Sequence, residues 1–263
     1  MLADAGYMAH LLLRLNLPNP MIDSTWQQLL AEVLALQKQP VLSGADRIKL
    51  WRNVVKLAEA AYSEAQALVA PYLVNIQQAL LQAQAAKNNV TLTEELRRRV
   101  FRNLHDLAQA NYQPAFEFLI ACLDHPDPTW RLQSLRNIGF HYVTAPESLF
   151  LKKARQLLRH DPDSDVRCAA ALILGIHSQW QDIALVTALN YDPEADVRAV
   201  AFASLLELAG VPRAKAWTYW QQVKRGEIQP TWEQVKRSVE QSGIDSNSTK
   251  LSRKQETQTK FEW

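Results

Sequence analysis

Glycine is scarce in this chain of 263 residues, which has 7 glycines against 12 prolines. Few glycines and few runs of β-branched residues argue against β-sandwiches and barrels, whose turns and strands use both. Long stretches rich in Leu, Ala, Gln, Glu and Arg favour helix instead. The sequence therefore predicts an all-α fold, in a chain long enough for one large domain or two small ones.

Charge of one sign and long apolar runs are also lacking. The formal net charge is +2 at pH 7, which is not the broad basic surplus typical of nucleic-acid binding. No window approaches the ~18 consecutive apolar residues of a membrane-spanning helix. We therefore expect no membrane span, and nucleic acid is not the favoured partner.

Only two cysteines are present, Cys122 and Cys168, and both stand in apolar, helix-like runs. A free cysteine in such a run behaves as a small hydrophobic residue. Two cysteines give no disulfide framework, and disulfides are rare in the reducing cytosol. We therefore expect two reduced thiols in a cytoplasmic protein.

The usual signatures of catalysis are missing. No two glycines lie close enough for a phosphate-binding loop, and the chain has no HExxH, CxxC or GxSxG motif. His141 and His177 occupy equivalent positions in the repeats described below, and such positions on helices about 8–10 Å apart do not converge on a metal ion. Cys168 beside His160 or His177 would make a nucleophile pair, but nothing orients the base. No metal, cofactor or catalytic residue is predicted.

Residues 1–112 form a predicted helical region without clear repeats. Pro71 should interrupt or restart one of its helices, because proline lacks the amide donor. Thr91 and Glu94 fit a capping box that opens the next helix. That helix holds the densest basic cluster of the chain: Arg97, Arg98, Arg99 and Arg102. Glutamates at 94 and 95 precede two of these arginines by four residues, so an ion-paired, solvated face is favoured over a phosphate contact.

Three later segments are similar to one another. They are HPDPTWRLQSLRNIG (125–139), HDPDSDVRCAAALILG (160–175) and YDPEADVRAVAFASLL (191–206). Aligning their arginines, which are Arg131, Arg167 and Arg198, also aligns a proline in each. The spacings are 36 and 31 residues. A unit of this length cannot bury its apolar face alone, so successive copies must stack.

Each unit is expected to be a helical hairpin, with helix A before the Asp-Pro turn and helix B after it. Proline ends helix A and suits the first turn of helix B. The predicted A helices cover 113–124, 147–159 and 179–190, and the predicted B helices cover 128–142, 164–177 and 195–209. A fourth, degenerate unit containing Trp217, Trp220 and Trp232 completes an array over 113–241. Residues 242–263 lose the hydrophobic periodicity and are expected to form a disordered tail.

The segments DPDSDVRCAAALILG (161–175) and DPEADVRAVAFASLL (192–206) resemble HEAT-like repeats, in particular the short type found in phycobilisome lyase subunits. The first copy departs from that pattern, with Thr129 in place of the aspartate. The resemblance implies an α-solenoid of HEAT-like helical hairpins after an irregular N-terminal helical region. It also implies that turn aspartates and helix-B arginines form a ladder between units, which gives a structural role to Asp165, Arg167, Asp196 and Arg198.

Helix B lines the concave face in such arrays, so its exposed positions are candidates for binding. Positions that are usually polar there are occupied by small or apolar residues in the second and third units, whereas the first unit keeps polar residues. The candidate groove residues are Gln133, Arg136, Cys168, Leu172, Ala199 and Ala203. An apolar groove is costly to leave in water unless a partner covers it. The tail or the N-terminal helices would cover it equally well.

The leading interpretation is a non-enzymatic binding or adaptor protein that holds a protein partner in this groove. By resemblance alone, an alternative is a phycobilin lyase subunit or chaperone acting on phycobiliproteins, with bilin as its ligand. A DNA-binding helical-repeat protein of the alkylpurine glycosylase type is a third alternative, although its acidic residue and basic cleft are not identifiable in this sequence.

Overall fold

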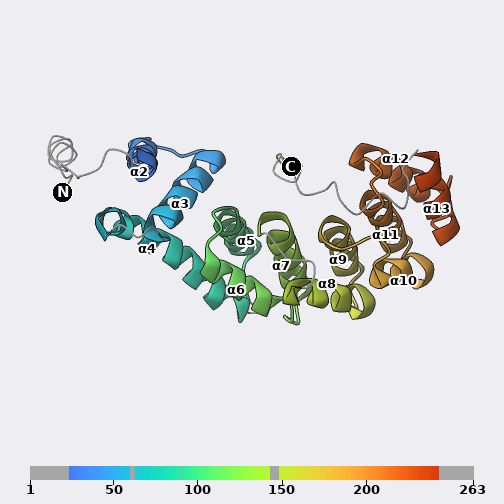
Figure 1. The fold of residues 1–263 in the computed structure, drawn as a ribbon. Helices are drawn as coiled ribbons and strands as arrows, with labels where there is room; N and C mark the ends of the chain where they lie inside the picture. Colours follow the sequence, from blue (N-terminus) through green and yellow to red (C-terminus); the bar gives the residue numbers. More distant parts are fainter. Residues whose placement is uncertain (1–23, 60–62, 90, 143–147, 243–263) are drawn as a thin grey trace. The chain divides into compact units, whose positions relative to one another are not determined.

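A computed structural model of the chain describes residues 24–59, 63–89, 91–142 and 148–242. Every regular element in these ranges is a helix (Figure 1), which confirms the all-α prediction. None of these helices is both long and apolar enough to cross a bilayer. The predicted tail lies outside the described residues except for Ser242. The chain divides into two compact units, and the division falls between Gln78 and Ala79.

The first unit contains α2 (Ser24–Gln37), α3 (Gly44–Glu59) and the first part of α4 (Ser63–Lys87). The helices α2 and α3 pack against each other. Their apolar faces supply buried side chains at the helical period: Trp26, Leu30, Val33, Val54 and Leu57. The Asn53 amide donates a hydrogen bond of 2.9 Å to Glu32, which joins the two helices beside this core.

Helix α4 continues through Pro71, so the predicted interruption is wrong. A proline inside a helix removes one backbone hydrogen bond and crowds the preceding turn. Val69 and Ile76, on either side of it, are completely buried. The burial of Val69 and Ile76 outweighs the hydrogen bond that is lost at Pro71, so the helix stays continuous.

The second unit arranges most of its helices in two layers (Figure 1). The A layer consists of α6 (Gln113–Cys122), α8 (Leu149–His160) and α10 (Ile183–Tyr191). The B layer consists of α5 (Glu94–Gln109), α7 (Pro128–His141), α9 (Ser164–His177) and α11 (Ala195–Leu208). Each A helix packs on the B helix that follows it in the chain, and α5, α7, α9 and α11 pack in succession. This is the stacking of hairpins that the repeat predicts.

The helix ends follow from local caps. Asp127 and Asp163 accept hydrogen bonds from the first-turn amides of α7 and α9, at 2.8 and 3.0 Å. Helix α10 begins at Ile183 rather than at 179, because Asp182 caps it through the Ala184 amide. Helix α5 is capped by Thr93 and not by Thr91, which instead bonds to Asn89. Side-chain caps of this kind satisfy amides that have no partner within the helix.

The B helices approach one another closely at two glycines. A Cβ atom added at Gly139 of α7 would lie 2.3 Å from Ile173 of α9, and one added at Gly175 of α9 would lie 2.6 Å from Ser204 of α11. Gly175 also lies close to backbone, with the Ser204 Cα atom at 3.0 Å. These glycines set the spacing between neighbouring B helices.

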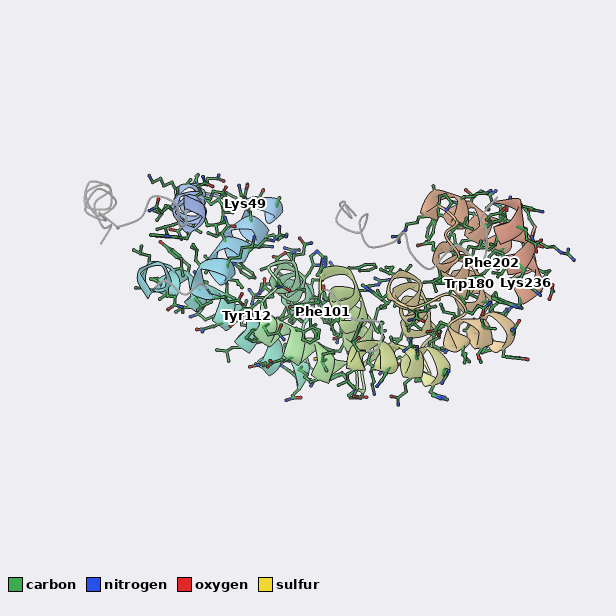
Figure 2. All side chains as sticks on the ribbon, viewed as in Figure 1. Lys49, Phe101, Tyr112, Trp180, Phe202 and Lys236 are labelled. Carbon is green, nitrogen blue, oxygen red and sulfur yellow. The ribbon has the colours of Figure 1, made fainter. Side chains whose placement is uncertain are left out.

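The last two helices, α12 (Arg213–Lys224) and α13 (Trp232–Gln241), depart from the layered pattern. Helix α12 packs along α11, and α13 contacts both α10 and α11. Figure 2 labels Phe202 of α11 and Trp180, which precedes α10. Phe202 meets Tyr219 of α12 with ring centroids 6.4 Å apart, and Trp180 meets Trp232 of α13 with ring centroids 5.5 Å apart. Helix α12 thus lies on α11 rather than extending the A layer.

Replacing Gly175 with alanine should destabilise the second unit, because the added Cβ atom meets the backbone of α11. Overpacking costs about 1–3 kcal/mol, and a helical Gly→Ala change returns up to about 1 kcal/mol. We expect a net loss of about 1–2 kcal/mol in the free energy of unfolding, measured by urea denaturation followed by circular dichroism. Gly44→Ala is the control, since nothing lies within 4 Å of its added Cβ atom. An unchanged midpoint for Gly175→Ala would contradict the close-packing explanation.

Candidate partner-binding surface

The arginines at the start of the first two repeated B helices each reach into the next repeat. Both Nε and Nη2 of Arg131 donate to the Asp161 carboxylate at 2.7 Å. Its Nη1 donates to the backbone carbonyls of His125 and Pro126, at 2.7 and 2.8 Å. The side chains of Arg131 and Asp161 are 9% and 2% exposed, so this ion pair is almost fully buried.

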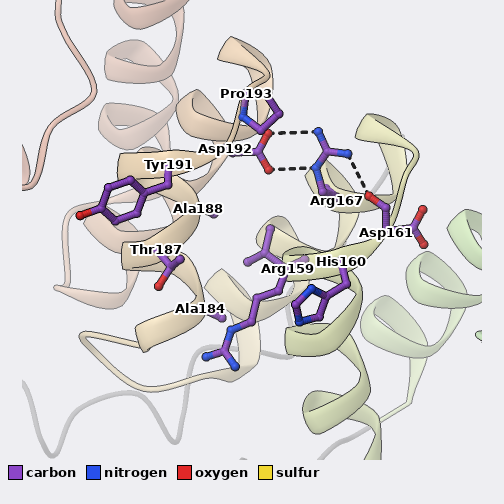
Figure 3. Close-up of a pocket in the computed structure, with 11 residues that line it drawn as sticks. Arg159, His160, Asp161, Arg167, Ala184, Thr187, Ala188, Tyr191, Asp192 and Pro193 are labelled. Atoms are coloured by element: carbon purple, nitrogen blue, oxygen red, sulfur yellow. Dashed lines mark hydrogen bonds and ion pairs between the residues drawn. The ribbon is translucent and has the colours of Figure 1, made fainter.

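Arg167 repeats the same geometry one unit later (Figure 3). It forms a bidentate pair with Asp192 at 2.9 and 3.1 Å and donates to the carbonyls of Asp161 and Pro162. The hydrogen bonds that Arg167 donates to Asp192 raise the pKa of its guanidinium above the ordinary value. Arg198 keeps only the carbonyl contacts, to Asp192 and Pro193, and has no ion pair within the described residues. The ladder therefore has two rungs.

The predicted ladder carboxylates were the wrong ones. Asp165 and Asp196 are exposed, and Asp196 pairs with Lys224 of α12 instead. Each stands two residues before the arginine of its helix, so it lies on a different side of that helix from the arginine. The rungs are formed instead by Asp161 and Asp192, which immediately precede the prolines of the turns.

The side of the B layer that the A layer does not cover is called here the open face. Four of the six predicted groove residues are accessible: Arg136 is exposed, and Gln133, Cys168 and Leu172 are half-buried. Arg136, Leu172 and Ala203 each stand five residues after the aligned arginine of their helix, so they occupy equivalent positions. The open face over α7 and α9 is accessible at these positions.

Ala199 and Ala203 are buried, at 0% and 7% exposure, so their prediction as open groove residues is wrong. Both lie between contacts that α11 makes with α12. Asp196 pairs with Lys224 one turn before Ala199, and Glu207 pairs with Arg213 one turn after Ala203. Helix α12 covers the open face at α11, which the sequence of α11 alone does not reveal.

Helix α5 belongs to the B layer and contributes to the open face, although the sequence analysis assigned it to the N-terminal region. Its side chains form a recess with those of α7, of about 550 Å³, lined by Glu94, Arg97, Arg98, Phe101, Arg102, Thr129 and Gln133. One signal was available in the sequence. His105 stands 36 residues before His141, which itself stands 36 residues before His177.

These three histidines make local polar contacts. Nδ1 of His105 lies 3.2 Å from both Asn137 Oδ1 and His141 Nε2, and the two imidazoles meet edge to face. Nε2 of His177 donates to the Gly139 carbonyl at 2.6 Å, and burial lowers the pKa of His177. No group of three or more His, Cys, Asp or Glu side chains in the described ranges is arranged to hold a metal ion.

A second recess lies in the A layer, between the C-terminal ends of α8 and α10 (Figure 3). Its volume is about 400 Å³, and its lining includes Arg159, Tyr191 and the ladder residues Arg167 and Asp192. Because the Arg167 guanidinium already binds a carboxylate and two carbonyls, it is not available as a ligand contact. This recess is a product of the ladder.

Both cysteines have environments that disfavour the thiolate. Burial raises the pKa of Cys122 to about 11 and that of Cys168 to about 12. Nearby carboxylates at Asp196 and Asp165 add to the effect at Cys168. The thiolate is the reactive form of cysteine, so neither side chain has the activation that a nucleophile needs.

Removing the Asp161 carboxylate should leave the buried Arg131 guanidinium without its counter-charge. We expect Asp161→Asn to lower the free energy of unfolding by about 3 kcal/mol, the usual cost of breaking a buried ion pair. Urea denaturation of the purified chain measures this. Asp165→Asn makes the same change four residues away at an exposed side chain and should leave stability nearly unchanged. Equal losses in the two variants would exclude the ladder as a special source of stability.

The raised cysteine pKa values predict slow alkylation of the folded chain. A thiol titrating near pH 12 has far less thiolate at pH 8 than an ordinary cysteine, so iodoacetamide should modify Cys168 about a hundredfold or more slowly than free cysteine. Mass spectrometry over time measures the rates. In urea both thiols should react at the rate of free cysteine. Rapid modification of Cys168 in the folded chain at pH 8 would show that burial does not raise the pKa of its thiol.

Comparison with known protein families gives one match. A family profile described as HEAT repeats matches residues 94–206, which begin at α5 and end within α11. No curated protein and no solved structure matches the chain. The profile starts with the helix that the 36-residue histidine spacing adds to the array. In its described residues the protein is all-helical, and residues 94–206 form a solenoid similar to the HEAT repeats.

Proposed function

We propose that this chain is a non-enzymatic adaptor that holds a protein partner on the open face of α5, α7 and α9. HEAT repeats generally serve as protein-interaction or scaffold modules, and the match to them supports this class of function. Stacked helical repeats present a continuous surface that suits another chain. The cytoplasmic location remains a prediction of the sequence.

The supporting observation is the way the chain covers its own open face. Helix α12 packs along α11 and buries Ala203. The equivalent positions on the two preceding B helices, Leu172 and Arg136, are left accessible. The covered position shows that a helix packs against this face. The partner would take the same place on α9 and α7 that α12 takes on α11.

The chemistry of the open face suits a protein partner. Leu172 and Cys168 give an apolar patch on α9, and Gln133 and Arg136 give a polar patch on α7. Protein interfaces combine an apolar centre with a polar rim in this way. The ladder arginines take no part, since their donors are used within the fold.

The lyase alternative still rests only on the resemblance of the repeat sequence. A role as a bilin lyase subunit or chaperone predicts a change in visible absorbance when bilin is mixed with the chain, and a requirement for a phycobiliprotein acceptor. Neither is required of an adaptor. The DNA-binding alternative predicts an affinity that falls steeply with salt.

A charge introduced at Leu172 should disrupt partner binding. The stable interactor would first be recovered with the native chain and identified, and then both proteins would be purified and their affinity measured by calorimetry. We expect Leu172→Glu to weaken binding about tenfold or more, because it places an unpaired carboxylate in an apolar contact. Far-UV circular dichroism should remain unchanged.

The matched control is Leu149→Glu, which introduces the same charge at an exposed leucine at the start of α8 in the A layer. Its affinity for the partner should equal that of the native chain. Full affinity in Leu172→Glu, or the same loss in both variants, would rule out the open face as the binding surface.

A further inference from the structure

Most arginines of the second unit have a carboxylate partner within the chain. Arg131 and Arg167 hold the ladder aspartates, Arg155 bonds to Asp182 at 2.8 Å, and Arg97 lies 3.6 Å from Asp127. The arginine side chains at the packing surfaces of this unit are therefore neutralised. Where exceptions lie together on an exposed surface, a charge from outside the chain would be accommodated.

Two exceptions lie together on the open face. Arg102 of α5 lines the recess with Gln133 of α7, and Arg136 stands one turn beyond Gln133 on the same side of α7. Both arginines are exposed, and neither forms an ion pair within the described residues. Arg98 at the rim pairs with Glu94, but both side chains are largely exposed. Such a surface pair is weak and easily exchanged.

The recess also has an aromatic wall. Phe101 lines it and meets the buried Trp130 edge to face, with ring centroids 4.9 Å apart. Trp130 packs against the phenyl ring and supports this wall from the core side. A guanidinium fork binds a carboxylate through two parallel hydrogen bonds, and an amide such as that of Gln133 donates to the same acceptors.

We propose that the recess between α5 and α7 takes an acidic segment of the partner protein, whose carboxylates bind Arg102 and Arg136. This inference rests on the proposed function and specifies the chemistry of the partner. Neighbouring B helices lie about 8–10 Å apart, and an extended chain advances about 3.3 Å per residue. A segment of about six residues therefore reaches from Arg102 to Leu172, with acidic residues at one end and an apolar residue at the other.

Charge around the recess favours a peptide over nucleic acid. Glu94 lines the recess itself, Glu95 is exposed on the same helix, and Asp165 is exposed on α9. These carboxylates interrupt the continuous basic track that a phosphate backbone needs, whereas a short acidic segment needs only the two neighbouring arginines. The net charge of +2 for the whole chain agrees with a local rather than an extended basic patch.

The test uses the full chain and three fluorescein-labelled probes: an octaglutamate peptide, an octaglutamine peptide and an oligonucleotide of eight thymidines. Fluorescence anisotropy at physiological salt measures binding. We expect the octaglutamate to bind and the octaglutamine not to bind. Arg102→Glu and Arg136→Glu should each weaken octaglutamate binding about tenfold, as expected for loss of a close charge pair.

Arg159→Glu is the matched control. Arg159 is exposed on α8 in the A layer, and its replacement by glutamate changes the net charge by the same amount. It should bind the octaglutamate as the native chain does. Equal weakening in all three variants would show a general charge effect and overturn the proposal. So would the absence of octaglutamate binding, or tighter binding of the thymidine probe, which would indicate nucleic acid.

The natural partner separates this inference from the proposed function. Suppose that Arg102→Glu and Arg136→Glu keep full affinity for the partner while Leu172→Glu loses it. The proposal of an acidic segment is then wrong, and the proposed adaptor function stands. If Leu172→Glu also binds normally, the open face itself is wrong. Loss of affinity in all three variants, with Arg159→Glu unaffected, supports both.

Discussion

Two buried ion pairs, Arg131 with Asp161 and Arg167 with Asp192, hold successive hairpins of the second unit in register. Each guanidinium lies at the start of one B helix, and its carboxylate lies in the turn of the next hairpin. A stacking arrangement shifted by one turn would leave both charges buried and unpaired, at a cost of several kcal/mol. The two guanidinium groups are therefore neutralised only when the hairpins stack correctly. The glycines at 139 and 175 add a steric condition to the same contacts.

The ladder also determines which part of the surface remains for recognition. Its arginines use their donors on carboxylates and turn carbonyls, so they act inside the fold. The accessible guanidinium groups of Arg102 and Arg136 lie on the open face of the B layer. The buried structural arginines and these accessible arginines thus lie on different sides of the B layer. This separation allows the open face to change in sequence without disturbing the stacking.

The sequence predicted the hairpins well because their signals are local. Asp-Pro turns and helical spacing placed the A and B helices to within a few residues. Of the two arginines predicted for the ladder, Arg167 forms an ion pair with the next repeat and Arg198 does not, whereas Arg131 forms a pair that was not predicted. The prediction of which aspartates form the ladder was wrong. The Asp-Pro segment contains several aspartates, and only the packing against the neighbouring repeat selects Asp161 over Asp165. The prediction also failed for Ala199 and Ala203, whose burial depends on α12, a helix contributed by a later part of the chain. Helix α5 was assigned to the N-terminal region because it lacks the Asp-Pro turn, although His105 continues the repeat spacing.

The position of α12 has a consequence for how any bound chain is aligned. Because α12 lies on the face of α11, a segment running along α5, α7 and α9 meets a physical stop before the fourth B helix. Such a segment cannot shift towards the C-terminal end of the array. Its register is therefore set by contact with α12 as well as by its own side chains.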